Sequence, residues 1–115
     1  MGFRRELAKR RPTTTDPETA WQPDFFGQYD IGLVNACNTG DEDAEISIYH
    51  DPTGTTYTED TALVWKFTLR PGDVLQLFGD ISDYRKEGSI GVESSVPDIV
   101  LFKIYGEIAD EVIAP

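Results

Sequence analysis

Apolar residues recur at every second position over most of the chain from Tyr29 onward, and this period limits the fold more than any other feature. Ile46 and Ile48, for example, alternate with Glu45 and Ser47. Such alternation places side chains on the two faces of a β-strand. About six segments follow this pattern or form a short apolar run of strand length: 31–37, 44–49, 63–69, 74–78, 88–93 and 99–105.

No sustained helical period follows Trp21, so helical crossovers between parallel strands are not expected. Turn-forming residues separate the segments at 38–43, 51–54, 70–73, 78–80 and 94–98. In the third of these, Pro71 and Gly72 take the central positions of a type II turn. A chain of 115 residues suffices for one domain with one core. We therefore predict an all-β fold: an antiparallel, jelly-roll-like β-sandwich with an extended N-terminal arm.

The last predicted strand, 99–108, is apolar on both faces. Leu101 and Tyr105 would lie on one face, and Phe102 and Ile104 on the other. Two interpretations fit this pattern. The strand is central in its sheet, or its outer face is covered by another chain.

The N-terminal part differs from the rest in charge. Residues 1–11 carry a net charge of +4 and residues 12–115 a net charge of −15, within a total of −11. We divide the chain into a basic arm and linker, 1–24, and a sandwich domain, 25–115. Within the arm, 3–10 could form two helical turns and 16–21 a shorter one. The sequence predicts an arm that is ordered only when held by a partner, so that deleting residues 1–20 would leave the sandwich folded.

The arm is the predicted interface. Its basic side chains would meet an acidic protein surface or a polyanion, and two apolar side chains would add contact area; a solvated basic tail without a partner is the alternative. These residues are Phe3, Arg4, Arg5, Leu7, Lys9, Arg10 and Arg11. The acidic body repels phosphate backbones, so we expect no nucleic-acid partner for the folded part. The longest run of large apolar residues, 99–102, is too short to cross a bilayer, and no secretory signal is recognisable, so no membrane partner is expected.

Residues able to carry chemistry are sparse. Cys37 is the single cysteine and is expected to be a small buried hydrophobe, and His50, the single histidine, a surface residue at a strand end. Two acidic loops, 41–43 and 51–60, leave calcium open as an alternative, although their spacing is not that of an EF-hand. Asp80 and Asp83 form no recognisable catalytic pair. We predict no enzyme, no metal and no cofactor.

Aromatic side chains leave glycan binding open as a second alternative, although aromatic residues in small β-domains more often belong to a core or an interface. The candidates are Trp21, Phe25, Phe26, Tyr49, Tyr57 and Tyr84.

Several motifs resemble those of small virion proteins of tailed bacteriophages. They lie at 34–40, where a strand ends in Asn-Thr, and at 44–51, 54–57, 61–63, 69–73, 89–95 and 102–108. Gly106 and Glu107 are adjacent, one residue shorter than the G-x-E-I ending of those proteins. The resemblance spans about residues 29–108 and leaves the arm outside it.

The resemblance implies a non-enzymatic β-sandwich subunit of a phage particle, most specifically a capsid decoration or cement protein anchored by its N-terminal arm. The implied partners are the major capsid or other virion proteins and further copies of the chain, often as a trimer. The implied location is the virion, assembled in the host cytoplasm. The main alternative is a tail, neck or baseplate fibre module that binds a receptor or glycan. An enzyme or a metal-dependent regulator is the third hypothesis.

Overall fold

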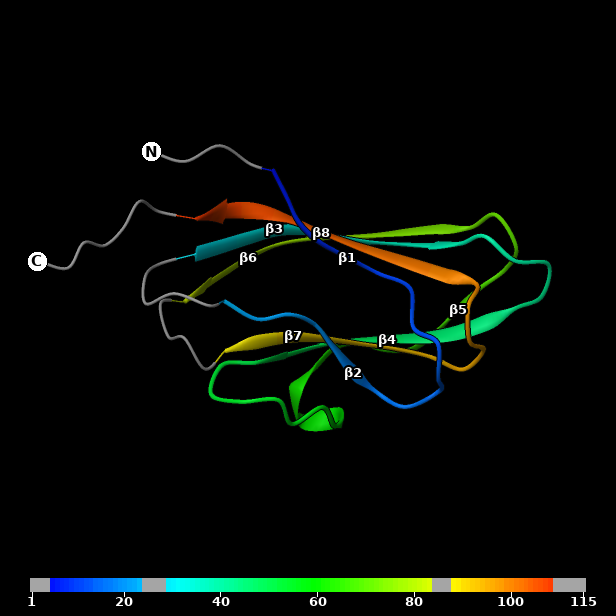
Figure 1. Ribbon diagram of the computed structural model, residues 1–115, viewed down its shortest axis with the longest axis horizontal. Helices are drawn as coiled ribbons and strands as arrows, with labels where there is room; N and C mark the ends of the chain where they lie inside the picture. The colour runs from blue at the N-terminus through cyan, green and yellow to red at the C-terminus, as the bar shows by residue number, and fades with distance from the viewer. Residues whose placement is uncertain (1–4, 24–28, 84–87, 109–115) are drawn as a thin grey trace, which may run out of the picture.

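The computed structural model describes residues 5–23, 29–83 and 88–108, and it has two four-stranded antiparallel sheets packed face to face (Figure 1). One sheet has the strand order β1-β8-β3-β6 and the other β2-β7-β4-β5. The strands are β1 (Arg5–Arg10), β2 (Glu18–Trp21), β3 (Tyr29–Asn38), β4 (Ala44–Asp51), β5 (Ala62–Leu69), β6 (Val74–Asp83), β7 (Ser89–Ser94) and β8 (Val100–Ile108), and a short 3-10 helix, η1 (Glu59–Thr61), precedes β5. The predicted all-β antiparallel sandwich is confirmed.

The pairing follows the topology of a jelly roll. Strands β1 to β4 pair with β8 to β5 in reverse order, as β1–β8, β2–β7, β3–β6 and β4–β5. Successive pairs alternate between the two sheets, as in a long double-stranded ribbon wound around one core. The winding leaves four edge strands, one at each end of each sheet: β1, β6, β2 and β5.

The core lies between the inner faces of the sheets. Its buried apolar residues are Tyr29, Ile31, Val34, Ala36, Ala44, Ile46, Ile48, Leu69, Ile90, Val92, Val100, Phe102 and Ile104. In β3 the alternation changes phase, because the pairing register shifts between Ile31 and Leu33. Ile31 is buried before this bulge and Val34 after it. The phase change explains why this segment is apolar at both odd and even positions.

The N-terminal segment is extended, but the helical turns predicted at 3–10 and 16–21 are wrong for the described residues. Residues 5–10 form β1 on the edge of β8, and residues 18–21 form β2 on the edge of β7. Leu7, Ala8 and Trp21 are partly buried against the core. Pairing with a long strand provides backbone hydrogen bonds and apolar contacts that a two-turn helix lacks. Residues 5–21 therefore supply one strand to each sheet.

Strand β8 is central, between β1 and β3, which confirms the first interpretation of its apolar faces. The type II turn at 70–73 is confirmed as well: the Asp73 amide donates to the Arg70 carbonyl at 2.9 Å, and Gly72 has φ +84°. The turn predicted at 78–80 is wrong. Strand β6 runs through it, and Gly79 lies where β3 and β6 shift register, so this glycine marks a bulge.

Candidate interaction surface

The two lateral sides of the sandwich differ in the side chains that they expose. Strands β1 and β2 contact each other on one side, and β5 and β6, joined by the turn 70–73, lie on the other (Figure 1). All the exposed large apolar side chains of the described residues lie on β5 and β6, and their exposed fractions run from 42% to 66%. They are Leu63, Trp65, Phe67, Val74 and Phe78. We call this set the apolar edge.

Strand β6 extends the rows of side chains that cross the outer face of its sheet. Phe78 lies opposite Leu33 of β3, which lies opposite Tyr105 of β8, and together they form an apolar row. A second apolar row joins Val74, Cys37 and Leu101. Cys37 is thus half-buried on an outer face, rather than buried as predicted.

A polar row lies between the two apolar rows. It joins Gln76 of β6, Asn35 of β3 and Lys103 of β8. The Oδ1 atom of Asn35 is buried and has no hydrogen-bond partner among the described residues. The outer face therefore presents an apolar, a polar and an apolar row, all of which end at the open side of β6.

An apolar pocket of about 170 Å³ lies where β6 bulges at Gly79. It is lined by Ile31 and Val34 of the core, Leu63 of β5, and Leu77, Phe78 and Ile81 of β6. Since Leu63 belongs to one sheet and the β6 residues to the other, the pocket lies between the two edge strands. A pocket of this size accepts a group about as large as benzene, such as one apolar side chain.

Strand β5 carries the aromatic part of the apolar edge. The Trp65 ring packs edge-on against Tyr49 with the centroids 6.3 Å apart, and the Lys66 ammonium lies 4.9 Å from the Trp65 centroid. Lys66 has φ +52°, and the register with β4 shifts in this region, so the edge of β5 is bulged. Tyr49 itself is buried and stacks on Tyr57.

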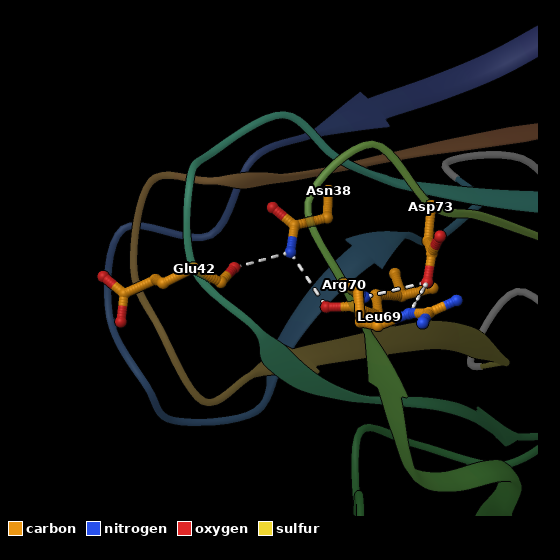
Figure 2. Close-up of polar contacts among 5 residues, drawn as sticks. All are labelled: Asn38, Glu42, Leu69, Arg70 and Asp73. Carbon is orange, nitrogen blue, oxygen red and sulfur yellow. Dashed lines mark hydrogen bonds and ion pairs between the residues drawn. The ribbon is translucent and has the colours of Figure 1, made fainter.

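Asn38 fixes the turn that joins β5 to β6 (Figure 2). Its side chain is buried and donates from Nδ2 to the carbonyls of Glu42, at 2.8 Å, and Leu69, at 2.9 Å. Its backbone amide donates to the Asp73 carbonyl at 3.0 Å, and its own carbonyl accepts from the Gly72 amide at 2.9 Å. One buried residue of β3 therefore holds the ends of both strands of the apolar edge.

The opposite side, formed by β1 and β2, is charged and irregular. Arg10 forms an ion pair with Glu18 that joins the two sheets, and the Arg11 guanidinium donates to Thr39 Oγ1 at 2.8 Å. The register is irregular in both strands, and proline residues flank β2 at positions 17 and 23. We call this side the basic edge.

The residues predicted to form the arm interface lie mostly on β1. Arg5, Lys9 and Arg10 are exposed there, whereas Leu7 is partly buried and packs against the core. Arg11 follows β1 and is also exposed. Phe3 and Arg4 lie outside the described residues.

The acidic loops have a structural explanation. Asp51 accepts hydrogen bonds from the amides of Thr53, at 3.0 Å, and Thr56, at 2.8 Å, and these bonds lower the pKa of the Asp51 carboxyl. Asp41, Glu42 and Asp43 are exposed. Within residues 5–23, 29–83 and 88–108, no group of three His, Cys, Asp or Glu side chains is placed to hold a metal ion. The side chains of Asp80 and Asp83 lie outside the described set.

Most of the candidate glycan-binding aromatics that the structure describes are packed. Trp21 meets Tyr29 edge-on at 4.9 Å, and the Tyr57 hydroxyl lies 2.8 Å from Thr19 Oγ1 and 2.7 Å from Ser89 Oγ. Phe25, Phe26 and Tyr84 lie outside the described residues. His50 is half-buried in β4, next to the end of that strand.

The surroundings of Tyr49 shift its ionisation. Burial, together with a hydrogen bond from its hydroxyl to the Glu93 carboxylate, raises the pKa of Tyr49 to about 12. Both causes favour the neutral phenol. This hydrogen bond joins β4 to β7 and holds the ring against which Trp65 packs, so it supports the aromatic part of the apolar edge.

Comparison with known protein families gives no match for this chain, and a search of curated proteins also gives none. Among the described residues, no helix has the length and apolar character needed to cross a membrane. The resemblance to phage virion proteins therefore stays a prediction.

Sequence reasoning recognised the apolar residues of β5 and β6 as strand residues but missed their exposure. Alternation shows that Leu63, Trp65 and Phe67 recur at every second position. It does not show that their strand lies at the edge of its sheet. One signal was available: Val64, at an intervening position, is also apolar, so both faces of this strand carry large apolar groups.

Proposed function

We propose that this chain is a non-enzymatic structural subunit, held in a larger assembly through its apolar edge. The observation that carries the proposal is that the exposed large apolar side chains of the described residues lie on β5 and β6, two edge strands that the turn 70–73 joins. Soluble monomers seldom leave such patches uncovered, and natural sandwiches normally protect their edges with charge. A surface that breaks both tendencies is best explained by a partner.

The specific assembly that we propose is a phage particle, in which the chain acts as a capsid decoration or cement subunit. Its support is the resemblance described above and the jelly-roll topology, which viral capsid domains share with several other protein classes. In this role the pocket beside Gly79 would receive an apolar side chain of the neighbouring virion protein. Many copies on one lattice would make modest individual contacts sufficient.

The structure changes the proposed means of attachment. Residues 5–10 are paired with β8, so the described part of the N-terminal segment is unsuited to act as a free strap. The contact surface that we propose is instead the apolar edge.

A tail, neck or baseplate module that binds a glycan is the second candidate. The observation that favours it is Trp65, which is 45% exposed and could stack on a sugar ring. A glycan module should bind oligosaccharides saturably and lose that binding in Trp65→Ala, whereas a decoration subunit should show no such binding.

The direct test of the virion role is to purify particles from a phage lysate that contains the chain and to measure the chain across a density gradient. We expect it to sediment with the particles at a fixed ratio to the capsid protein. Phe67→Ser should reduce this ratio, because it removes apolar contact area, and Lys9→Ala on the basic edge is the matched control. A chain that stays in the soluble fraction while capsid protein sediments would contradict the proposal.

A further inference from the structure

We propose that β6 pairs antiparallel with β6 of a second copy, about a twofold axis at Gln76, and so joins two four-stranded sheets into one. The inference rests on the proposed function in one respect: it assigns a partner to part of the apolar edge. It leaves β5, with Trp65 and Phe67, for the larger assembly.

The part of β6 that we propose as the contact is a regular strand. From Val74 to Phe78, β6 pairs with β3 without a register shift, from the Cys37–Val74 pair to the Leu33–Phe78 pair. The opposite side of this stretch is a sheet edge, with backbone groups of β6 directed away from β3. Strand β5 lacks this property because its pairing with β4 is irregular on both sides of Ile48. A regular edge is the better template for another strand.

The side chains of residues 74–78 follow an order that suits pairing with a second copy. Val74-Leu75-Gln76-Leu77-Phe78 reads nearly the same in both directions: a large apolar residue, leucine, glutamine, leucine, a large apolar residue. In an antiparallel pair centred on Gln76, Val74 lies opposite Phe78 of the second copy, and Leu75 opposite Leu77. The two glutamine amides meet at the axis, where they can hydrogen-bond to each other.

The proposed pairing also continues the rows of side chains on the outer face from one copy into the other. In this register the apolar row ending at Phe78 continues into the row that begins at Val74 of the second copy. The polar row ending at Gln76 continues into its own equivalent. A shift by one residue would instead place the Gln76 amide against a leucine and bring inner-face and outer-face side chains onto the same side.

Charge does not oppose a second copy at residues 74–79 of β6. Two chains with a net charge of −11 each repel one another at most orientations. Residues 74–79 of β6 include no charged residue, and the paired Arg70 and Asp73 of the adjoining turn offset each other. The basic edge is less suitable for self-pairing, because it would bring Arg5, Lys9 and Arg10 of the two copies close together. A twofold pair thus replaces the trimer that the resemblance implied.

The oligomeric state of the purified chain is the first test. Light scattering should give twice the mass of one chain, and Phe78→Lys should halve that mass, because it brings a charge into an apolar contact. Trp65→Lys on β5 is the matched control and should leave the mass doubled. Both positions are exposed, so neither substitution should unfold the chain. A monomer or a trimer of the unaltered chain, or a dimer that Phe78→Lys leaves intact, would overturn the proposal.

Disulfide trapping tests the register, in a Cys37→Ser background that removes the native thiol. Gln76→Cys should form a covalent dimer under mild oxidation, because opposed Cα atoms lie about 5 Å apart, within disulfide range. Val74→Cys alone should give roughly tenfold less dimer, since its equivalent would lie about 14 Å away along the strand. Mixing Val74→Cys with Phe78→Cys chains should restore cross-linking. Efficient dimer from Val74→Cys, with none from Gln76→Cys, would exclude this register.

These measurements separate the inference from the proposed function. A monomeric chain that still sediments with particles would overturn the β6 pairing alone. A dimeric chain that never joins particles would overturn the virion role alone.

Discussion

The two lateral edges of the sandwich differ in how far their edge strands are protected against pairing with another chain. On the basic edge, β1 is bulged and carries Arg5, Lys9 and Arg10, while β2 is four residues long and lies between prolines. On the apolar edge, β6 is ten residues long and has no charged residue from 74 to 79. Short length, bulges, charge and proline are the usual protections of an edge strand.

This contrast shows that the exposed edge is not a general weakness of the fold. The same chain that protects one side leaves residues 74–78 of β6 open on the other, next to a turn held in place by the buried side chain of Asn38. An edge that is both unprotected and held in place is suited to a partner. The basic edge, by comparison, closes the sandwich.

The strongest test of this contrast is to remove β1. Deleting residues 1–11 should abolish the cooperative thermal transition seen by circular dichroism, because β8 loses its neighbour and the core loses Leu7 and Ala8. The loss should equal most of the total stability, which is about 5–15 kcal/mol for a typical domain. The double variant Arg5→Ala/Lys9→Ala, which keeps the strand, should melt like the full chain. An unchanged melt for the deleted chain would restore the interpretation of this segment as a separate tether.

The second prediction tests what holds the apolar edge in place. Asn38→Ala should lower the free energy of unfolding by about 3 kcal/mol, because the buried Leu69 carbonyl, the partly buried Glu42 carbonyl and the Gly40 amide lose their partner. Asn35→Ala on the same strand is the control. Its buried Oδ1 has no partner, so the change should be within about 0.5 kcal/mol or slightly stabilising in urea unfolding. Equal effects of the two substitutions would contradict the assigned role of Asn38.

The sequence could predict the strands from 29 to 108 because each carries alternating side chains or a short apolar run, and in β3, β4, β7 and β8 this pattern records burial against the core. It could not predict β1 and β2, because their apolar residues come in adjacent pairs, Leu7-Ala8 and Ala20-Trp21, within irregular strands. Short charged segments of this kind form strands only when they can pair with the edge of a longer strand. Which strand has a free edge depends on the tertiary structure, not on the local sequence.

The candidate site was less predictable than the fold. Gly79 looked like a turn residue because the same backbone freedom serves turns and bulges. The exposure of Trp65 and Phe78 depends on β5 and β6 being edge strands. The alternation of side chains within a strand does not show where that strand lies in its sheet. The type II turn at 70–73, by contrast, was predictable because proline and glycine specify it locally.

The third prediction concerns the support behind β5. The pKa of Tyr49 is raised to about 12, from an ordinary value of 10, so the folded state favours the neutral phenol. This stability is fully present below pH 10 and is lost as the pH rises towards 12, by about 2 kcal/mol. The measurement is urea unfolding at several pH values from 9 upward. Tyr49→Phe should remove this part of the pH dependence, and an equally steep loss in that variant would assign it to other groups.

The smallest expected effect lies at the ion pair that joins the sheets on the basic edge. Arg10→Ala should cost about 0.5 kcal/mol in urea unfolding, because half of the arginine side chain is exposed and water screens the pair. Glu18→Ala should cost a similar amount, and the double variant little more than either single variant. A loss of several kcal/mol would mean that charge, rather than strand pairing, closes this edge.

Hydrogen–deuterium exchange at low and high protein concentration tests most directly which edge is the interface. We predict that the amides of residues 74–78 exchange more slowly as the concentration rises, while those of Arg5–Arg10 are unchanged. Slowing confined to β1 and β2, with β6 exchanging at the same rate at both concentrations, would contradict it.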